Sequence, residues 1–225
     1  MSDLLLLATW SAVLAAGLAF AVQLRRFGLA TTYVRDLIHV GASVWVFGWR
    51  YWESAAAMMA LPLCALAMVL ILPMIASRSR IARGIVESMS NGEERWAGIV
   101  AYVLAYAIFT GVALVADRFT AACALLSLSW GDGIGGLVGR RFGRHFYRVP
   151  WGKKKSIEGS LAVACFAFLG ALAAALCYGA GPAPVTLLAM IAVALAASIS
   201  EAIAPRASDN LAVPFAVLFA GLIFS

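Results

Sequence analysis

The chain is organised around residues 131–160, which read GDGIGGLVGRRFGRHFYRVPWGKKKSIEGS. This segment leaves an apolar run with an acid, Asp132, placed between two glycines. It continues as a dense basic loop and ends on KKKSIEGS at residues 153–160. Nearly all of the remaining sequence is apolar enough to form membrane helices. We therefore expect the chemistry of the protein to lie in or next to this segment.

The composition excludes an ordinary soluble domain. Of the 225 residues, 64% are hydrophobic and only 12% are charged, and the mean hydropathy is +0.93. A soluble domain of this length needs a charged surface that this sequence cannot supply. The sequence therefore predicts an all-α polytopic membrane protein, because helices satisfy their own backbone polar groups where water is absent. We expect one transmembrane domain over residues 1–225.

Apolar runs of roughly 20 residues predict about eight transmembrane helices. They lie near residues 4–24, 37–52, 54–76, 97–116, 119–139, 159–179, 184–204 and 209–224. The first run follows Met-Ser-Asp rather than the basic segment of a cleaved signal peptide. We therefore expect it to remain as the first span.

The loops between these runs alternate in charge. Most Lys and Arg residues fall on one side of the predicted membrane, whereas Arg50 and Arg118 fall on the other. By the positive-inside rule the basic side is cytoplasmic, which places both termini outside. We expect a bacterial inner-membrane protein whose active site faces the cytoplasm. The net charge of +6 then indicates anionic headgroups and nucleotide phosphates as partners rather than nucleic acid.

One cytoplasmic loop, at residues 77–96, mixes Arg and Glu with regularly spaced apolar residues. This pattern predicts a short amphipathic helix at the membrane interface, followed by a turn at Asn91-Gly92. A solvated connector without further function would show a similar pattern.

Ionisable residues inside or at the ends of membrane spans are costly and usually functional. In this sequence they are Asp132, Glu158, Glu201, Asp209 with its neighbour Asn210, and His39. The topology puts the four acids on different helices at one depth, near the cytoplasmic boundary. This arrangement predicts a shared polar cavity, although interfacial acids that only extend into water would look the same.

A polyphosphate would suit the basic end of the central segment. Lys153, Lys154 and Lys155 supply point charges, with Arg140 and Arg141 nearby. Ser156 and the backbone amides after it would open a helix, whose N-terminus attracts phosphate. The G-x-x-x-x-G-K-[ST] pattern of a P-loop is absent.

A nucleotide would bring Mg²⁺, a hard cation that takes one or two carboxylates together with phosphate oxygens. Asp132 is the best-placed ligand in the sequence, and Glu158 is the second. The glycines around Asp132 recur at helical spacing. They allow close approach either of a ligand or of a neighbouring helix.

Several short motifs match those of a known family of membrane enzymes. They are Gly131-Asp132-Gly133, Gly139-Arg140-Arg141-Phe142-Gly143, Lys155-Ser156-Ile157-Glu158-Gly159-Ser160, Glu201, and Asp209-Asn210-Leu211-Ala212-Val213-Pro214. They resemble the polyprenol kinase family, which contains phytol kinase, farnesol kinase and dolichol kinase. The stretch from Arg35 to His39 is similar to the family's early R-K-x-x-H element, with Asp36 in place of the lysine.

The resemblance implies a kinase that transfers a phosphoryl group from CTP, or from UTP, to a lipid alcohol with the help of Mg²⁺. The alcohol would be phytol, geranylgeraniol, farnesol or a longer polyprenol. On this hypothesis Asp132 binds Mg²⁺, and Glu158 is a second ligand or orients Lys155. Asp209 and Asn210 complete the metal or nucleotide site, and the general base is Asp132, Glu201 or His39.

Three alternatives remain open at this stage. The family's relatives include CDP-diacylglycerol synthase, a cytidylyltransferase, and CTP-dependent diacylglycerol kinase, and both would use the same triphosphate. A small membrane transporter with an acidic vestibule would also place acids at one depth, but it leaves the lysine cluster unexplained. The sequence makes no prediction of the oligomeric state.

Overall fold

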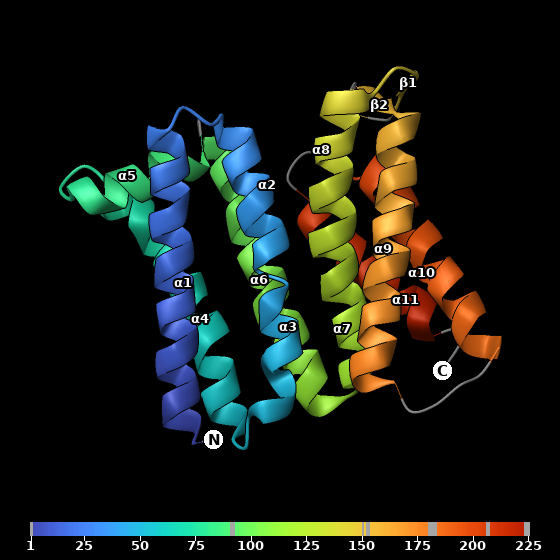
Figure 1. Cartoon of the computed structure of the whole chain (residues 1–225), viewed down its shortest axis with the longest axis horizontal. Helices are drawn as coiled ribbons and strands as arrows, with labels where there is room; N and C mark the ends of the chain where they lie inside the picture. The colour runs from blue at the N-terminus through green and yellow to red at the C-terminus, as the bar shows by residue number, and fades with distance from the viewer. Residues whose placement is uncertain are drawn as a thin grey trace. The chain divides into compact units, whose positions relative to one another are not determined.

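A computed structural model describes residues 2–90, 93–149, 151, 154–179, 184–205 and 208–222. The chain forms two compact units, Met1–Gly111 and Val112–Ser225 (Figure 1). Each unit is built almost entirely of helices, which confirms the predicted all-α class. The expectation of a single membrane domain over the whole chain stays a prediction.

Five helical segments in the described residues are long and apolar enough to cross a membrane. They are Asp3–Arg26, Ala55–Ile75, Trp96–Val115, Arg118–Phe142 and Ile157–Tyr178. Leu187–Ile203 and Asp209–Gly221 are shorter apolar helices, at the places where the seventh and eighth spans were predicted. The membrane class follows from these helices, whereas the count of eight spans and the outward termini stay predictions.

The first unit consists of helices that are connected by short turns. They are α1 (Asp3–Arg26), α2 (Thr31–Gly41), α3 (Val44–Gly48), the short 3₁₀ helix η1 (Trp49–Tyr51), α4 (Ala55–Ile75), α5 (Arg80–Met89) and α6 (Glu93–Val115), whose last residues belong to the second unit. Among these, α1 packs against α2, α4 and α5.

The predicted span at residues 37–52 differs from what the structure contains. The helix begins earlier, at Thr31, and is divided into α2, α3 and η1. The turn between α2 and α3 keeps helical dihedral angles, but its backbone bonds tighten to the i to i−3 pattern, with Ser43 N donating to Val40 O at 3.2 Å. Hydropathy alone missed the first turn because Thr31, Arg35 and Asp36 are polar.

The amphipathic helix predicted in the loop at residues 77–96 is present as α5. Ser79 caps its N-terminus by accepting a hydrogen bond from Ala82 N at 3.3 Å. Met89 packs in a cluster with Val69 and Ile99, whereas Ile81 is 78% exposed. The apolar face therefore packs partly on the unit itself. The turn predicted at Asn91-Gly92 lies outside the described residues.

The second unit continues the chain from within α6 and holds the central segment of the sequence. Its elements are α7 (Arg118–Leu126), the π-helical segment η2 (Ser127–Asp132), α8 (Gly133–Phe142), strands β1 (Phe146–Arg148) and β2 (Lys154–Ser156), α9 (Ile157–Tyr178), α10 (Pro184–Ile203) and α11 (Asp209–Leu222). Helix α9 packs against α7, η2, α8 and α10, so it is the central helix of this unit.

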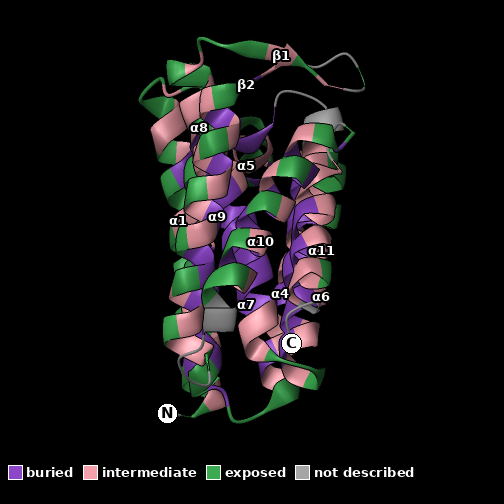
Figure 2. Cartoon of the chain, turned by 90° about the vertical axis from the view of Figure 1, so that its right-hand side faces the viewer, coloured by how far each residue is buried: buried purple, intermediate pink, exposed green. Residues whose placement is uncertain are grey.

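The basic loop forms a short β-hairpin, which the sequence did not predict. Strands β1 and β2 pair antiparallel, with Tyr147 opposite Lys155 and Arg148 opposite Lys154. Because side chains alternate along a strand, Tyr147 and Lys155 share one face of the hairpin. Both are partly buried, whereas Phe146, Arg148 and Lys154 are exposed (Figure 2).

The glycines around Asp132 serve helix packing. A Cβ at Gly131 would lie 3.2 Å from the carbonyl oxygen of Val163, and one at Gly139 would lie 3.4 Å from Cα of Gly159. Gly135, between them at a spacing of four residues, faces Val163 in the same way. Of the two interpretations left open by the sequence, the structure therefore supports close approach of α8 and α9 at these glycines.

This packing predicts a position-specific effect of one added methyl group. In Gly135→Ala the new Cβ would overlap Cγ2 of Val163 and lie 3.1 Å from its backbone N. We expect a loss of about 1–3 kcal/mol in the free energy of unfolding, measured by thermal or denaturant unfolding in detergent. Gly136→Ala is the control, because its Cβ would meet only the flexible end of Arg140 at 3.2 Å. Equal effects at both positions would refute this account.

Candidate active site

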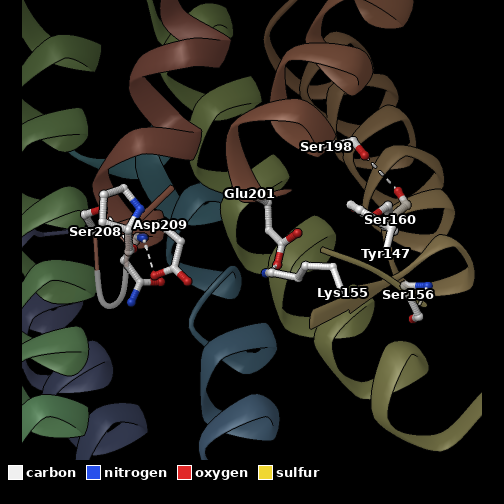
Figure 3. A network of polar contacts seen from close by, with 11 residues as sticks. Tyr147, Lys155, Ser156, Ser160, Ser198, Glu201, Ser208 and Asp209 are labelled. Carbon is white, nitrogen blue, oxygen red and sulfur yellow. Dashed lines mark hydrogen bonds and ion pairs between the residues drawn. The ribbon is translucent and has the colours of Figure 1, made fainter. Parts of the chain in front are cut away.

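The second unit contains an ion pair between a strand and a helix that are far apart in the sequence. The ammonium group of Lys155, in β2, donates a hydrogen bond to Oε1 of Glu201, in the last turn of α10 (Figure 3). The side chain of Lys155 is 19% exposed and that of Glu201 is 8% exposed. A charged pair so little exposed requires both partners, since either charge alone would be desolvated without compensation.

One hydrogen bond joins the hairpin face that carries Lys155 to α9, and a second joins α9 to α10. The hydroxyl of Tyr147, opposite Lys155, lies 2.5 Å from Oγ of Ser160 in α9. Oγ of Ser198 in α10 donates to the carbonyl oxygen of Ser160 at 2.9 Å (Figure 3). The hairpin, α9 and α10 are therefore linked next to the ion pair, which fixes where the ammonium group lies.

Two further carboxylates act on the same ammonium group. Burial lowers the pKa of Lys155, but the charge and hydrogen bond of Glu201 outweigh this effect. The carboxylates of Asp132 and Asp209 raise the pKa further, so it lies above its ordinary value and Lys155 stays protonated. Of the four acids predicted to converge, Glu201 contacts Lys155 directly, and Asp132 and Asp209 act on it through their charge.

Asp132 owes its place to the π-helical segment η2, of which it is the last residue. This segment packs against α9, α10 and α11, so it lies inside the second unit. Ser127, Ser129 and Gly131 are small and buried, which permits this close packing. Single π-helical turns inside α-helices are often found at functional sites. The sequence predicted a continuous helix at residues 119–139 and gave no signal for the π-helical turn.

Glu158, the fourth acid, makes contacts that the sequence did not predict. Its carboxylate accepts hydrogen bonds from the backbone N of Arg144 at 3.1 Å and of His145 at 3.2 Å. The Nδ1 atom of His145 lies 2.6 Å from Oε1 of Glu158. These contacts connect the start of α9 to the turn before β1. The carboxylate therefore holds this turn, and the predicted role as a metal ligand or an orienter of Lys155 stays a prediction.

Ser156 begins α9 as predicted. Its Oγ accepts a hydrogen bond from Gly159 N at 3.1 Å, which makes it the N-cap, and its side chain is buried. At the start of α11, Asp209 Oδ1 accepts from the backbone N of Asn210 at 3.1 Å. Both residues thus lie at helix N-termini, where an anion is favoured.

The remaining predicted residues are placed as follows. Arg140, Arg141 and Lys154 are exposed, the arginines in the last turn of α8 and the lysine on β2. Lys153 lies outside the described residues. His39 is buried in the first unit, where its ring centroid lies 3.8 Å from that of Tyr102, with the rings tilted by 41°. The hydroxyl of Tyr102 donates a hydrogen bond to the carbonyl oxygen of His39. The candidate active site consists of residues of the second unit, and His39 is not among them.

Sequence reasoning missed the residues that hold the hairpin. Tyr147, Ser160 and Ser198 carry the link described above, and Trp151 Nε1 donates to the carbonyl oxygen of Ile203 at 3.2 Å. Ile203 follows Glu201 by two residues in α10. Strands of three residues are too short for their alternation to stand out in a sequence, so nothing singled out Tyr147. Ser160 lies in one of the family motifs, but its contact with the hairpin was not predicted.

The residues present fit a magnesium–nucleotide complex better than a bare metal ion. Within the described parts of the chain, no three His, Cys, Asp or Glu side chains form a ready-made metal site. Mg²⁺ in nucleotide sites usually takes one or two carboxylates and receives its other ligands from phosphate and water. Asp132 and Asp209 supply hard oxygen ligands of this kind next to a fixed cation.

Comparison with known proteins identifies the family. The chain is 32% identical over 208 residues to a phytol kinase of Synechocystis sp., and the match covers 86% of this chain and 80% of that protein. No protein-family model and no solved structure matches the chain. An identity at this level over this length shows that the chain belongs to the phytol and polyprenol kinase-like family, as the motifs indicated.

The ion pair predicts a non-additive effect on stability. Glu201→Gln removes the charge that is hydrogen-bonded to Lys155, and we expect a loss of about 1–3 kcal/mol in the free energy of unfolding. Replacing both partners, as Lys155→Met with Glu201→Leu, should recover part of this loss, because neither partner then remains as a charge without the other. A double-mutant cycle in detergent measures the coupling. Strictly additive losses would mean that the two side chains are not coupled.

Proposed function

We propose that this chain is a membrane kinase that transfers the γ-phosphoryl group of a nucleoside triphosphate to the hydroxyl of an isoprenoid alcohol. The family motifs favour CTP, or UTP, as the donor. Phytol, geranylgeraniol, farnesol and longer polyprenols are the candidate acceptors. The observation that supports this proposal best is the 32% identity to a phytol kinase, together with a protonated lysine held among carboxylates in the segment that carries the family motifs.

Lys155 is the residue that we assign to the triphosphate. Its ammonium group is kept protonated and is held in place by Glu201 and by the pairing of β2 with β1. A phosphate oxygen near this group would share the charge now directed to Glu201. Phosphoryl transfer depends mainly on positioning and on neutralising charge, and a fixed ammonium group meets both needs. Arg140 and Arg141, exposed at the end of α8, would add positive charge around the phosphates.

Asp132 and Asp209 are the carboxylates that we assign to Mg²⁺. We prefer Asp209 to Glu158 as the second ligand, because both oxygens of Glu158 already accept hydrogen bonds from the turn at residues 144–145. When bound, Mg²⁺ would neutralise charge on the phosphates and orient them. Asp132 and Asp209 also balance the positive charge of Lys155 in the absence of nucleotide.

Proton transfer from the alcohol requires a group that can accept a hydrogen bond. Asp132 and Glu201 are the candidates for this role in the second unit, and Glu201 already accepts a hydrogen bond from the ammonium group of Lys155. The isoprenoid tail would remain between membrane helices with its hydroxyl at their polar ends. On the charge distribution of the loops, we assign these ends to the cytoplasmic side.

A labelled nucleotide distinguishes the candidate functions. Purified chain is incubated with geranylgeraniol, phytol, diacylglycerol or phosphatidate, each with Mg²⁺ and γ-labelled CTP, UTP or ATP, and the lipid and aqueous products are separated. A kinase transfers the label to the lipid. A cytidylyltransferase acting on phosphatidate releases the label in pyrophosphate, and a transporter does neither. Label on diacylglycerol, but on no isoprenoid alcohol, would replace the proposed acceptor with the alternative one.

The assignment of Asp132 predicts a loss of activity without a loss of fold. We expect Asp132→Asn to lower kcat by about 100-fold or more, because the amide binds Mg²⁺ weakly and is no base. The midpoint of thermal unfolding should change little. Asp117→Asn is the matched control, since Asp117 caps the start of α7 through bonds to Phe119 N and Thr120 N. Near-normal turnover of Asp132→Asn would remove this residue from the mechanism.

A further inference from the structure

The segment from the end of α8 through the hairpin carries many basic residues and no acidic one. From Arg140 to Lys155 the sequence contains seven Lys and Arg residues and no Asp or Glu. Lys155 uses its charge internally, in the pair with Glu201. Arg144 and Arg148 are exposed, on the turn before β1 and on β1 itself. Their charge is therefore available to a partner outside the second unit.

Three large aromatic side chains are exposed among these charges. Phe142 is 62% exposed, Phe146 is 61% exposed and Trp151 is 64% exposed. Exposed aromatic residues next to cations are typical of segments that lie in the headgroup layer of a bilayer, where the rings leave water and the charges meet phosphate. A loop that projects into open water would gain nothing from three such rings.

The two faces of the hairpin separate these features from the candidate active site. Tyr147 and Lys155 lie on one face and bond to Ser160 and Glu201. The side chains of Phe146 and Arg148 alternate with Tyr147 along β1, and both are exposed. Phe146, Arg148 and Lys154 therefore stay exposed while Tyr147 and Lys155 are held against the helices.

We propose that this exposed side is a docking surface for anionic lipid headgroups. We call it the anchor surface and define it by Phe142, Arg144, Phe146, Arg148 and Trp151. The rings enter the interface, and the guanidinium groups of Arg144 and Arg148 bind lipid phosphate. Complementary charge favours an anionic bilayer over a zwitterionic one, because zwitterionic headgroups offer no net negative potential.

The anchor surface also connects lipid charge to the proposed catalysis. Arg148 pairs with Lys154, which is the neighbour of Lys155 on β2. The indole of Trp151 donates a hydrogen bond to the carbonyl oxygen of Ile203, two residues after Glu201 in α10. Binding of the exposed side to headgroups would therefore steady the strand that presents Lys155. This consequence rests on the proposed function, whereas the lipid binding does not.

Bromine-labelled lipids test the binding directly. The full chain is reconstituted in vesicles of phosphatidylcholine with about one third phosphatidylglycerol, with bromine on the acyl chains of one lipid or of the other. The fluorescence of Trp151 is the difference between the chain and its Trp151→Phe variant. We expect brominated phosphatidylglycerol to quench Trp151 roughly twofold more per molecule than brominated phosphatidylcholine.

Matched variants show whether the arginines cause this preference. Arg144→Gln with Arg148→Gln should abolish it. Arg118→Gln should keep it, because Arg118 begins α7 at the opposite end of the continuous helix 118–142, about 36 Å away at 1.5 Å per residue. If Trp151→Phe perturbs folding, Phe142→Trp is made in a chain that keeps Trp151. The fluorescence difference between this variant and the unaltered chain then gives a second probe on the same surface.

Each result decides the proposal. Equal quenching by the two lipids, or no quenching by either, overturns it. Turnover with labelled nucleotide supplies a second measurement: phosphatidylglycerol should raise turnover of the chain but not of the double arginine variant. If that variant instead has a raised KM for nucleotide in both lipid mixtures and quenching shows no preference, the arginines bind nucleotide and the anchor surface is refuted. If the chain has no kinase activity, the proposed function fails, and the quenching preference alone still tests the binding of anionic lipid.

Discussion

The ion pair between Lys155 and Glu201 joins the hairpin to α10 and so brings the candidate site of the second unit together. A lysine and a glutamate that are largely buried lose their hydration, and each is tolerated only because the other compensates. The pair joins a hairpin to the end of α10, 46 residues further along the chain. This contact helps to fix the position of the Lys155 ammonium group and to balance its charge. The carboxylates of Asp132 and Asp209 act on the same group through their charge.

The packing of the helices allows these groups to meet. Gly131, Gly135 and Gly139 let η2 and α8 approach α9 closely, and close approach of helices in a membrane requires such small residues. The π-helical turn then changes the direction of the side chains at its end, where Asp132 lies. Ser156 and Glu158 stabilise the point where the hairpin passes into α9. Apolar packing thus supplies the rigidity, and a few polar contacts set the geometry.

Membership of the phytol and polyprenol kinase-like family gives this geometry a chemical context. A lipid alcohol and a water-soluble nucleotide meet only at a membrane boundary, which is where the polar ends of apolar helices lie. Carboxylates and a fixed lysine at such a boundary can bind a charged phosphate while the apolar helices accommodate a hydrocarbon tail. The hairpin carries Lys155 on one face, and it also carries exposed aromatic and basic side chains.

Composition, apolar length and short motifs are properties of local sequence, so they were enough to predict the membrane class, most of the helices, the N-cap at Ser156 and the family. The sequence also indicated that Asp132, Glu201 and Asp209 belong near the lysine cluster. The pairing of Lys155 with Glu201, and the bonds between Glu158 and the turn at residues 144–145, emerge only from the folded chain. Those contacts join residues distant in the chain, and they depend on a three-residue strand and a π-helical turn too short to leave a periodic signal.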